Sequence, residues 1–482
     1  MHHPHLRNQL RLITLTGVFG SLWMWMISGA VMTRFARQMH VPDWGFGLLA
    51  ALPFLGTLFQ LLASYLLDHH VGRKRLFLAF GIPSRLLWIV IAAIPWWLPG
   101  QHAWWFPMMV AVLAVLWATE NIGVPAWMSW MGDVVPTRLR GRFFAFRQII
   151  SKPITVIVSL GIGWGLDFIT NHHAQWMLRF TSTILIVAGV FGAINIIIHG
   201  WVHDPNQPTT QPAGQWMRKL LTPLRHREFR CYVVFSFSFA LATGYTGQYI
   251  WLYLFDAGQM NNLWANLLLV AIPCVVSIPA YTIWGRLIDR HGRKPVLIIG
   301  MLGVVASPIG WVIMISGQAP WAYAIVLLGM FCFPGVDIAT TNIMLSFADR
   351  RDGDSSGTAM VATNSIMMAV GGMLSGLIGA LIAKSLIGTY WTLPIVNLSL
   401  SYHALLLLLS ATLRGLSLLW ILGMPEAKAA PTRDVIRYMT ASLYGNARQA
   451  LLMPTRVVGQ IYRRSYPLKL TDRDASENQQ HP

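Results

Sequence analysis

The sequence has 482 residues, of which 55% are apolar and only 11% are charged, and its mean hydropathy is +0.52. A soluble protein has about 25% charged residues, so these values exclude an ordinary soluble domain. The net charge of +18 would indicate a nucleic-acid partner in a soluble protein. In a membrane protein, basic residues gather in cytoplasmic loops and at anionic lipid surfaces instead, so we expect a lipid bilayer and no nucleic acid as partner.

Apolar runs long enough to cross a bilayer follow one another along the chain. Each needs roughly 20 apolar residues, and the first is too long for a signal peptide and is not followed by a small-residue cleavage site. The pattern predicts an all-α membrane protein with twelve transmembrane helices, at about 12–33, 44–67, 76–98, 104–131, 146–169, 177–200, 230–254, 262–288, 296–316, 320–347, 358–386 and 397–424.

Composition divides these helices into two groups. A segment rich in Pro, Gln and Thr separates the sixth helix from the seventh and cannot be a membrane helix. We expect an N-terminal six-helix bundle (1–203), a cytoplasmic linker (204–229), a C-terminal six-helix bundle (230–424) and a basic cytoplasmic tail (425–482). Part of the tail has apolar residues at helical spacing and could lie on the inner membrane surface; a solvated tail is the alternative.

The two halves repeat weakly. A shift of 216 residues superimposes Asp133 on Asp349 and Gly141 on Gly357. The same shift superimposes the small pair Ser159/Gly163 on Ser375/Gly379. Such pairs let membrane helices approach each other closely, so we expect helices 5 and 11 to pack tightly against neighbours. Parallel six-helix halves explain the repeat.

Basic residues predict the orientation. If both termini are cytoplasmic, 29 of the 36 Lys and Arg fall on that side. By the positive-inside rule, the chain is a multi-pass protein of the cell membrane, the inner membrane in a bacterium, with both termini in the cytoplasm. The three cysteines show no CxxC or Cys/His ligand spacing, so we expect neither a disulfide framework nor a metal site.

The segment Gly285 to Pro295 reads GRLIDRHGRKP and lies between helices 8 and 9. Gly292 permits a tight turn between two helices, and Asp289 at a helix end can accept hydrogen bonds from nearby Arg side chains. A second copy, from Ser64 to Lys74, departs from this pattern: Ser replaces the first Gly, and one extra residue precedes Gly72. A simple alternative is that these basic residues only satisfy the positive-inside rule.

The intact segment resembles the GxxxD(R/K)xGR(R/K) signature of the major facilitator superfamily (MFS). The segment Asp133 to Gly141 resembles the DxxPxxxRG element of the same family. The resemblance implies the MFS fold, with two pseudo-symmetric six-helix bundles. It also implies a latch that stabilises one conformational state, formed by Asp289, Arg290, Gly292 and Arg293, with Asp68, Gly72, Arg73, Asp133 and Arg140 in the first half.

The resemblance further implies that helices 1, 4, 7 and 10 line a central cavity. The polar and aromatic residues expected there suit a polyol, sugar or other amphipathic solute, although ordinary helix packing would explain them as well. They are Trp25, Asn121, Tyr245, Gln248 and Tyr249.

Two carboxylates, Glu120 and Asp337, lie 12 or 13 residues before the acid at the cytoplasmic end of their helix, about 18–20 Å at 1.5 Å per residue. Carboxylates at mid-bilayer are costly and mark proton or ion paths. Arg85 reaches a similar depth and could pair with Glu120, which would make that acid structural. Arg414 could face Asp337.

These observations predict a secondary active transporter that moves a small organic solute, with sugars among the candidates, by alternating access and coupled to protons. The alternatives are a uniporter in which both acids are structural, a lipid flippase and a non-transporting membrane sensor. An intramembrane enzyme is not expected, because the sequence has no HExxH motif, no protease-like aspartate pair and no Ser-Lys pair on one face. No cofactor is expected.

Overall fold

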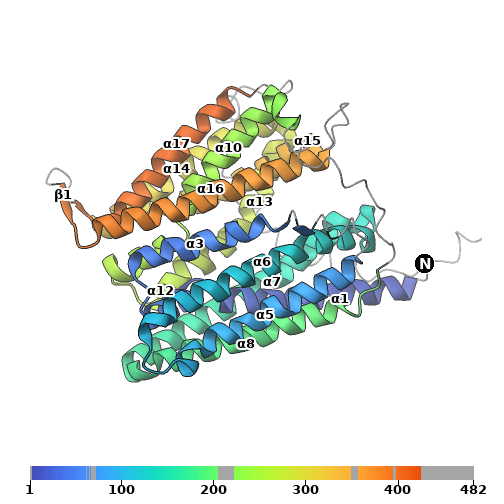
Figure 1. Cartoon of the computed structure of the whole chain (residues 1–482). Helices are drawn as coiled ribbons and strands as arrows, with labels where there is room; N and C mark the ends of the chain where they lie inside the picture. Colours follow the sequence, from blue (N-terminus) through green and yellow to red (C-terminus); the bar gives the residue numbers. More distant parts are fainter. Residues whose placement is uncertain are drawn as a thin grey trace, which may run out of the picture.

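The computed structural model describes residues 3–60, 62, 63, 66, 72–204, 222–317, 319–348, 357–393 and 398–424. Within these ranges it is built almost entirely of helices that run side by side (Figure 1). The expected tail, most of the expected linker, and Asp68 lie outside the described residues.

The first half contains the helices α1 (His3–Met26), α2 (Ala30–Gln38), α3 (Asp43–Thr57), α5 (Arg73–Trp97), α6 (His102–Val134), α7 (Thr137–His172), η1 (Ala174–Trp176) and α8 (Met177–His199). The second half, after η3 (Thr222–Arg225), contains α10 (Arg227–Gly244), α11 (Tyr249–Leu252), η4 (Tyr253–Ala257), α12 (Asn262–Asn266), η5 (Leu267–Ala271), α13 (Ile272–His291), α14 (Arg293–Ser316), α15 (Ala322–Ala348), α16 (Gly357–Leu386) and α17 (Tyr402–Leu422). A short antiparallel hairpin, β1 (Trp391–Leu393) with β2 (Leu398–Leu400), precedes α17.

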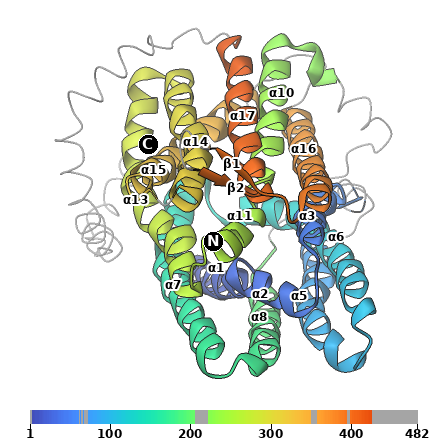
Figure 2. The same ribbon diagram turned by 90° about the vertical axis from the view of Figure 1, so that its left-hand side faces the viewer.

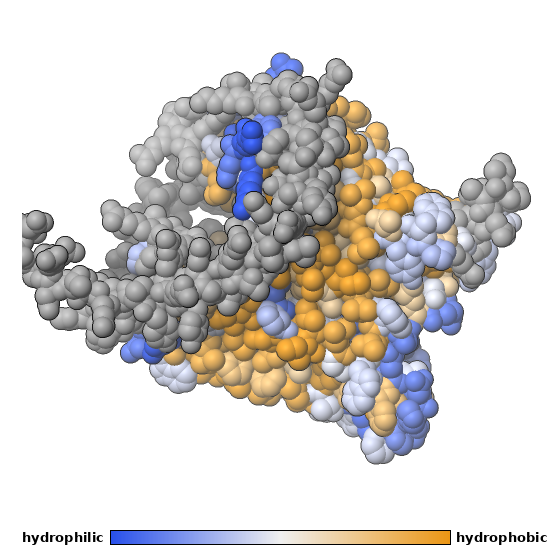
Figure 3. Space-filling model, turned by 180° about the vertical axis from the view of Figure 1, so that it is seen from behind, coloured by the Kyte–Doolittle hydropathy of each residue, from blue (hydrophilic) through white to orange (hydrophobic). Residues whose placement is uncertain are grey.

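Nine helices of the described part are long and apolar enough to cross a membrane. If the bent pair α1 and α2 is counted as one span, the described part has up to ten such spans. The shorter α3, and α10 with α11, occupy the second and seventh of the twelve predicted positions, so the arrangement is consistent with twelve spans. Figure 3 shows the broad apolar surface expected of helices in lipid, with hydrophilic residues gathered at its lower right edge.

Helices pack mainly within their own half. In the first half α5 lies against α6 and α8, and in the second α14 lies against α15 and α17. Contacts between the halves are concentrated in two places. In one, α3 packs against α16; in the other, α7 packs against α12 and η5. We name the two ends of the helices by what they carry: the linker end has Arg73, Asp133 and Asp204, and the far end has Asp43, Asp256 and Tyr402. In Figure 1 the halves spread apart toward the end that carries the N-terminus, which is the linker end.

Small residues bring the halves together. A Cβ atom on Gly47 of α3 would lie 2.5 Å from the backbone oxygen of Gly376 of α16, so the two backbones touch. On α7, Ser159 donates a hydrogen bond to Asn266 Oδ1 at 3.2 Å, and Gly163 lies directly against Leu263. These contacts confirm the close approach predicted from the small pair on helix 5. On α16, Gly379 similarly lies against the Tyr249 ring.

The two Gly-Arg-Lys turns differ in their backbone. Gly292 joins α13 to α14 with φ +94° and ψ 170°, a region open essentially only to glycine. Gly72 precedes α5 with φ −58°, which any residue can adopt. The intact motif therefore needs its glycine for the turn, and the altered first copy does not.

Candidate functional site

A cavity of about 560 Å³ lies among helices α1, α5, α6, α7 and α8 of the first half. The second half contributes Cys274 of α13 to its wall. Phe77 and Met128 also line it. Phe77 lies about 6 Å along α5 from Arg73, and Met128 lies about 7.5 Å along α6 from Asp133. The cavity thus extends toward the linker end of the molecule.

One face of α7 supplies about half of the polar residues in the cavity wall. The lining residues of this helix recur at intervals of three, four and five, so they share one face, and they are Arg147, Gln148, Ser151, Lys152 and Thr155. This face was not among the predicted cavity residues, because the cavity wall was expected on helices 1, 4, 7 and 10. The signal was present in the sequence as polar residues at helical spacing within an otherwise apolar run.

Deep in the cavity, Arg85 and Glu120 form an ion pair. Arg85 Nη1 and Nη2 donate to the two carboxylate oxygens of Glu120 at 2.5 and 2.7 Å, and Ser84 also donates to Glu120 at 2.7 Å. The guanidinium lies 3.5 Å from the centre of the Trp23 ring. Gly192 of α8 makes room for it, since a Cβ there would lie 2.5 Å from Arg85 Cδ. This is the pairing predicted from helix depth as the structural alternative for Glu120.

His199, at the end of α8, is held as a neutral imidazole by its hydrogen bonds. Trp127 Nε1 can only donate, and it lies 3.0 Å from His199 Nε2, which must therefore accept. The other ring nitrogen, Nδ1, lies 2.8 Å from the backbone oxygen of Asn195 and so carries the proton. His199 thus adds no charge to the cavity.

The other predicted cavity residues have different surroundings. Trp25 lines the cavity together with Arg85 and Glu120. Asn121 is not among the lining residues and accepts a hydrogen bond at 3.0 Å from Gln60, which follows the end of α3. Tyr245 and Tyr249 are 2% and 1% exposed and are not among the lining residues.

Tyr245 and Tyr249 therefore belong to the core, contrary to their prediction as cavity wall. Tyr249 packs against Tyr402 of α17 with ring centroids 6.4 Å apart, and it lies against Gly47 and Gly379 across the small-residue contact. Gln248, between the two tyrosines, is half-buried and is also not among the lining residues. Helix packing, the alternative to a cavity role, explains the tyrosines at helical spacing.

Asp337 lies exposed on α15 and accepts a hydrogen bond from Tyr281 of α13 at 2.7 Å. Tyr281 follows Cys274 by seven residues, so both share one face of α13, about 10.5 Å apart along its axis. Asp337 therefore stands on the side of the second half that faces the cavity region, nearer the linker end. Arg414 does not face it: the Arg414 side chain is buried and donates to Val304 O and Thr246 Oγ1 at 2.9 and 3.1 Å. The prediction that Arg414 faces Asp337 was therefore wrong.

The described contacts of the predicted latch residues lie within their own halves. Arg73 binds Asp133 at 2.6 Å and Asp204 at 2.7 Å, which ties the start of α5 to the end of α6 and to the segment that follows α8. In the second half, Arg293 donates to the backbone oxygen of Asn342 at 3.1 Å. Asp289 and Arg290 are exposed at the end of α13, and the side chain of Arg140 is outside the described part.

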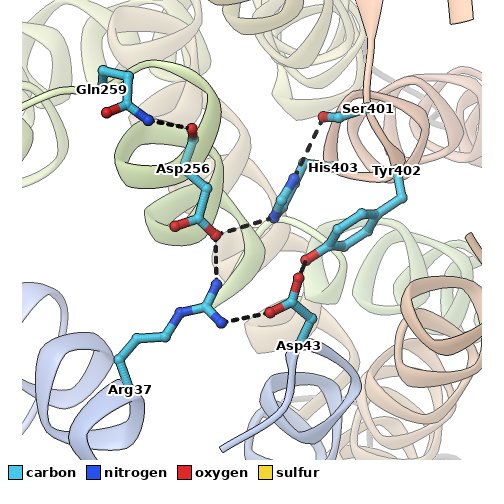
Figure 4. A network of polar contacts seen from close by, with 7 residues as sticks. All are labelled: Arg37, Asp43, Asp256, Gln259, Ser401, Tyr402 and His403. Atoms are coloured by element: carbon cyan, nitrogen blue, oxygen red, sulfur yellow. Dashed lines mark hydrogen bonds and ion pairs between the residues drawn. The ribbon is translucent and has the colours of Figure 1, made fainter. Parts of the chain in front are cut away.

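A polar network joins the two halves at the far end (Figure 4), and Figure 2 shows the molecule from this end. Arg37 of α2 donates to Asp43 of α3 and to Asp256 of η4, both at 2.5 Å. Tyr402 of α17 donates to the other oxygen of Asp43 at 2.5 Å, and His403 Nε2 lies 3.9 Å from Asp256. We call these five residues the far-end network.

The far-end network also places Asp43, Asp256 and His403 close enough to hold a metal ion. Sequence spacing could not reveal this trio, because its members come from three separate segments. The Arg37 guanidinium lies between the two carboxylates (Figure 4) and donates to both of them, so the geometry favours an ion-pair network between the halves.

A second contact closes the same end. Asp167, near the end of α7, accepts from the backbone N–H groups of Asn262 and Leu263 at 2.7 and 2.8 Å. These groups begin α12, where unpaired N–H groups favour an anion. Arg34 donates to Asn262 Oδ1 at 2.8 Å. The halves are thus joined at the far end and spread at the linker end.

The chain matches the family model of the Major Facilitator Superfamily over residues 14–376, so it belongs to this superfamily of multi-pass membrane transporters. Among solved structures it is similar to the inward-open xylose transporter XylE from E. coli, at 15% identity and a TM-score of 0.61, over 90% of this chain and 99% of that one. It is also similar to a D-xylose–proton symporter (14%, TM-score 0.63, 87% and 98%) and to the nucleoside transporter NupG (12%, TM-score 0.59, 87% and 98%). No curated protein matches it in sequence. The structural likenesses, all at low identity, establish the fold.

Proposed function

We propose that this chain is a secondary active transporter that moves a small organic solute by alternating access, coupled to protons. The observation that carries the proposal is a polar cavity enclosed by the helices of a transporter fold whose two halves are joined by an ion pair at the far end. Its volume suits a small solute, since ligand sites occupy about 300–1,000 Å³. The sugar and nucleoside transporters with a similar fold support a small organic cargo of this kind.

We further propose that the linker end faces the cytoplasm, so that this conformation is inward-facing. The excess of basic residues at that end supports it. Met128 lines the cavity and is 62% exposed. A cysteine at this position, in a chain whose three native cysteines are replaced by alanine, should react with an impermeant thiol reagent in inverted vesicles and be protected in intact cells. The reverse pattern would contradict the orientation.

Of the two mid-membrane acids, Asp337 is the better candidate for proton coupling. Glu120 is held by a buried arginine, whereas the described contact of the Asp337 carboxylate is a hydrogen bond from a neutral tyrosine. An acid with no fixed countercharge can gain and lose a proton as its surroundings alternate. The competing function, a uniporter, would leave Asp337 without a role in energy coupling.

Replacing Asp337 with Asn should abolish proton-driven accumulation in proteoliposomes while counterflow exchange, which needs no net proton movement, is retained. The measurement compares both assays at equal protein density, with Lys384→Gln as a control that removes an exposed charge at the end of α16. If the Asn variant still concentrates the solute like the parent, the uniporter is favoured. Absence of exchange in the parent itself would count against transport.

A further inference from the structure

The charges in the cavity wall do not balance. Its lining contains three cations, Arg85, Arg147 and Lys152, and one carboxylate, Glu120, which leaves two positive charges in excess. We propose, on the basis of the transport function above, that the cavity binds an organic anion through Arg147 and Lys152. The cargo then carries a carboxylate or phosphate group on a small body.

Glu120 is not available to neutralise these two cations. Both of its oxygens accept from Arg85, and one accepts from Ser84 as well. His199 is neutral in the tautomer that its neighbours impose. Across the described residues, no carboxylate lies within ion-pair distance of Arg147 or Lys152. Asp337, the acid on the facing half, is hydrogen-bonded to Tyr281 instead.

Arg147 is positioned as part of the wall. It lies across α1, where a Cβ on Gly17 would come within 2.6 Å of Arg147 Nε, so the absence of a side chain at Gly17 admits the guanidinium. Its charged group lies 5.5 Å from the centre of the Trp127 ring. This contact with an aromatic face holds a cation in place and leaves its donors free to bind an oxyanion in the fork geometry typical of arginine.

Lys152 lies five residues further along α7, about 7.5 Å deeper in the membrane, and is half-buried. Among the described residues its ammonium group contacts Cys274 Sγ, at 4.0 Å on the facing half. A thiol group does not balance an ammonium charge. A cation at this depth is costly without a countercharge, and a bound anion would supply one while contacting both halves.

The remainder of the wall indicates what carries the anionic group. Trp23, Trp25 and Trp127 contribute aromatic surface beside the cations, and the cavity volume of about 560 Å³ suits one small molecule. A cargo with an oxyanion at one end and an apolar or aromatic part at the other fits this wall. A neutral sugar would leave both cations unpaired.

The test uses pairs of solutes that differ in the anionic group. Thermal unfolding of the purified full-length protein is measured with benzoate against benzamide, gluconate against sorbitol, and glucose 6-phosphate against glucose. At least one acid should raise the unfolding temperature, because a ligand that binds the folded state stabilises it, and its neutral partner should have little effect. The first two pairs report a carboxylate preference and the third a phosphate preference.

Variants then locate the site. Lys152→Gln and Arg147→Gln should each weaken binding of the stabilising acid by about tenfold or more, the cost of losing one hydrogen bond to a charged group, and Lys152→Arg should retain binding. Lys384→Gln and Arg179→Gln remove the same charges from exposed positions outside the cavity and should leave binding unchanged. Unfolding temperatures without solute show whether each variant is folded.

Three outcomes would overturn the proposal: no acid stabilises the protein, the neutral partner stabilises it equally, or the two glutamine variants bind the acid like the parent. Exchange in proteoliposomes separates this proposal from the function on which it rests. Exchange of neutral solutes alone would refute the proposal of an anionic cargo and support the transport function. Specific acid binding without exchange of any solute would support the anion site and refute transport.

Discussion

Replacing Glu120 with Gln should lower the unfolding temperature of the protein sharply, by more than the loss of an exposed ion pair would. The substitution keeps the shape of the side chain but leaves Arg85, which is 6% exposed, without its countercharge. Removing one partner of a buried ion pair costs about 3–5 kcal/mol. Thermal unfolding of the purified variant, followed by its intrinsic fluorescence, measures the loss.

A paired substitution separates structure from function at this site. Arg85→Met combined with Glu120→Leu removes both charges, and replacing a buried pair by apolar residues is often neutral for stability. The double variant should therefore recover most of the unfolding temperature lost by Glu120→Gln. If it recovers both stability and transport, the pair is structural. If Glu120→Gln alone unfolds like the parent, the pair contributes little and this interpretation is wrong.

Replacing Arg37 with Ala should shift the protein toward the state that is open at the far end. Arg37 forms two ion pairs in the far-end network, one of them across the halves, and these side chains are up to 40% exposed. For ion pairs in contact with water we assign about 1 kcal/mol or less each. Loss of the one pair that crosses the halves should then change the ratio of the two states by up to about fivefold.

The labelling rate of a cysteine at Met128 reports this shift. The cavity extends toward the linker end and Met128 is exposed in its wall, so the labelling rate from that side should fall in Arg37→Ala. Arg179→Ala is the matched control, because Arg179 is exposed at the start of α8 and is outside the far-end network. An unchanged rate in Arg37→Ala would show that the network does not hold the far end closed.

Several features of this protein follow from sequence alone, because each depends on a local property. Long apolar runs must become helices in a bilayer, since unpaired backbone groups are too costly there. The turn at Gly292 follows from the conformational freedom of glycine, and the close packing of Ser159 and Gly163 follows from their small size. The motif around Asp289 identified the superfamily, which the family model confirms.

Only the tertiary structure decided which face of each helix points inward. In a membrane, lipid and protein core are both apolar, so hydropathy does not reveal how a helix is rotated about its axis. For this reason Tyr245 and Tyr249 were assigned to the cavity although they lie in the core, whereas Arg147 and Lys152 were overlooked in its wall. The far-end network joins Arg37, Asp256 and Tyr402 from separate segments of the chain. Contacts at such separations arise when two halves pack, and no spacing along one helix encodes them.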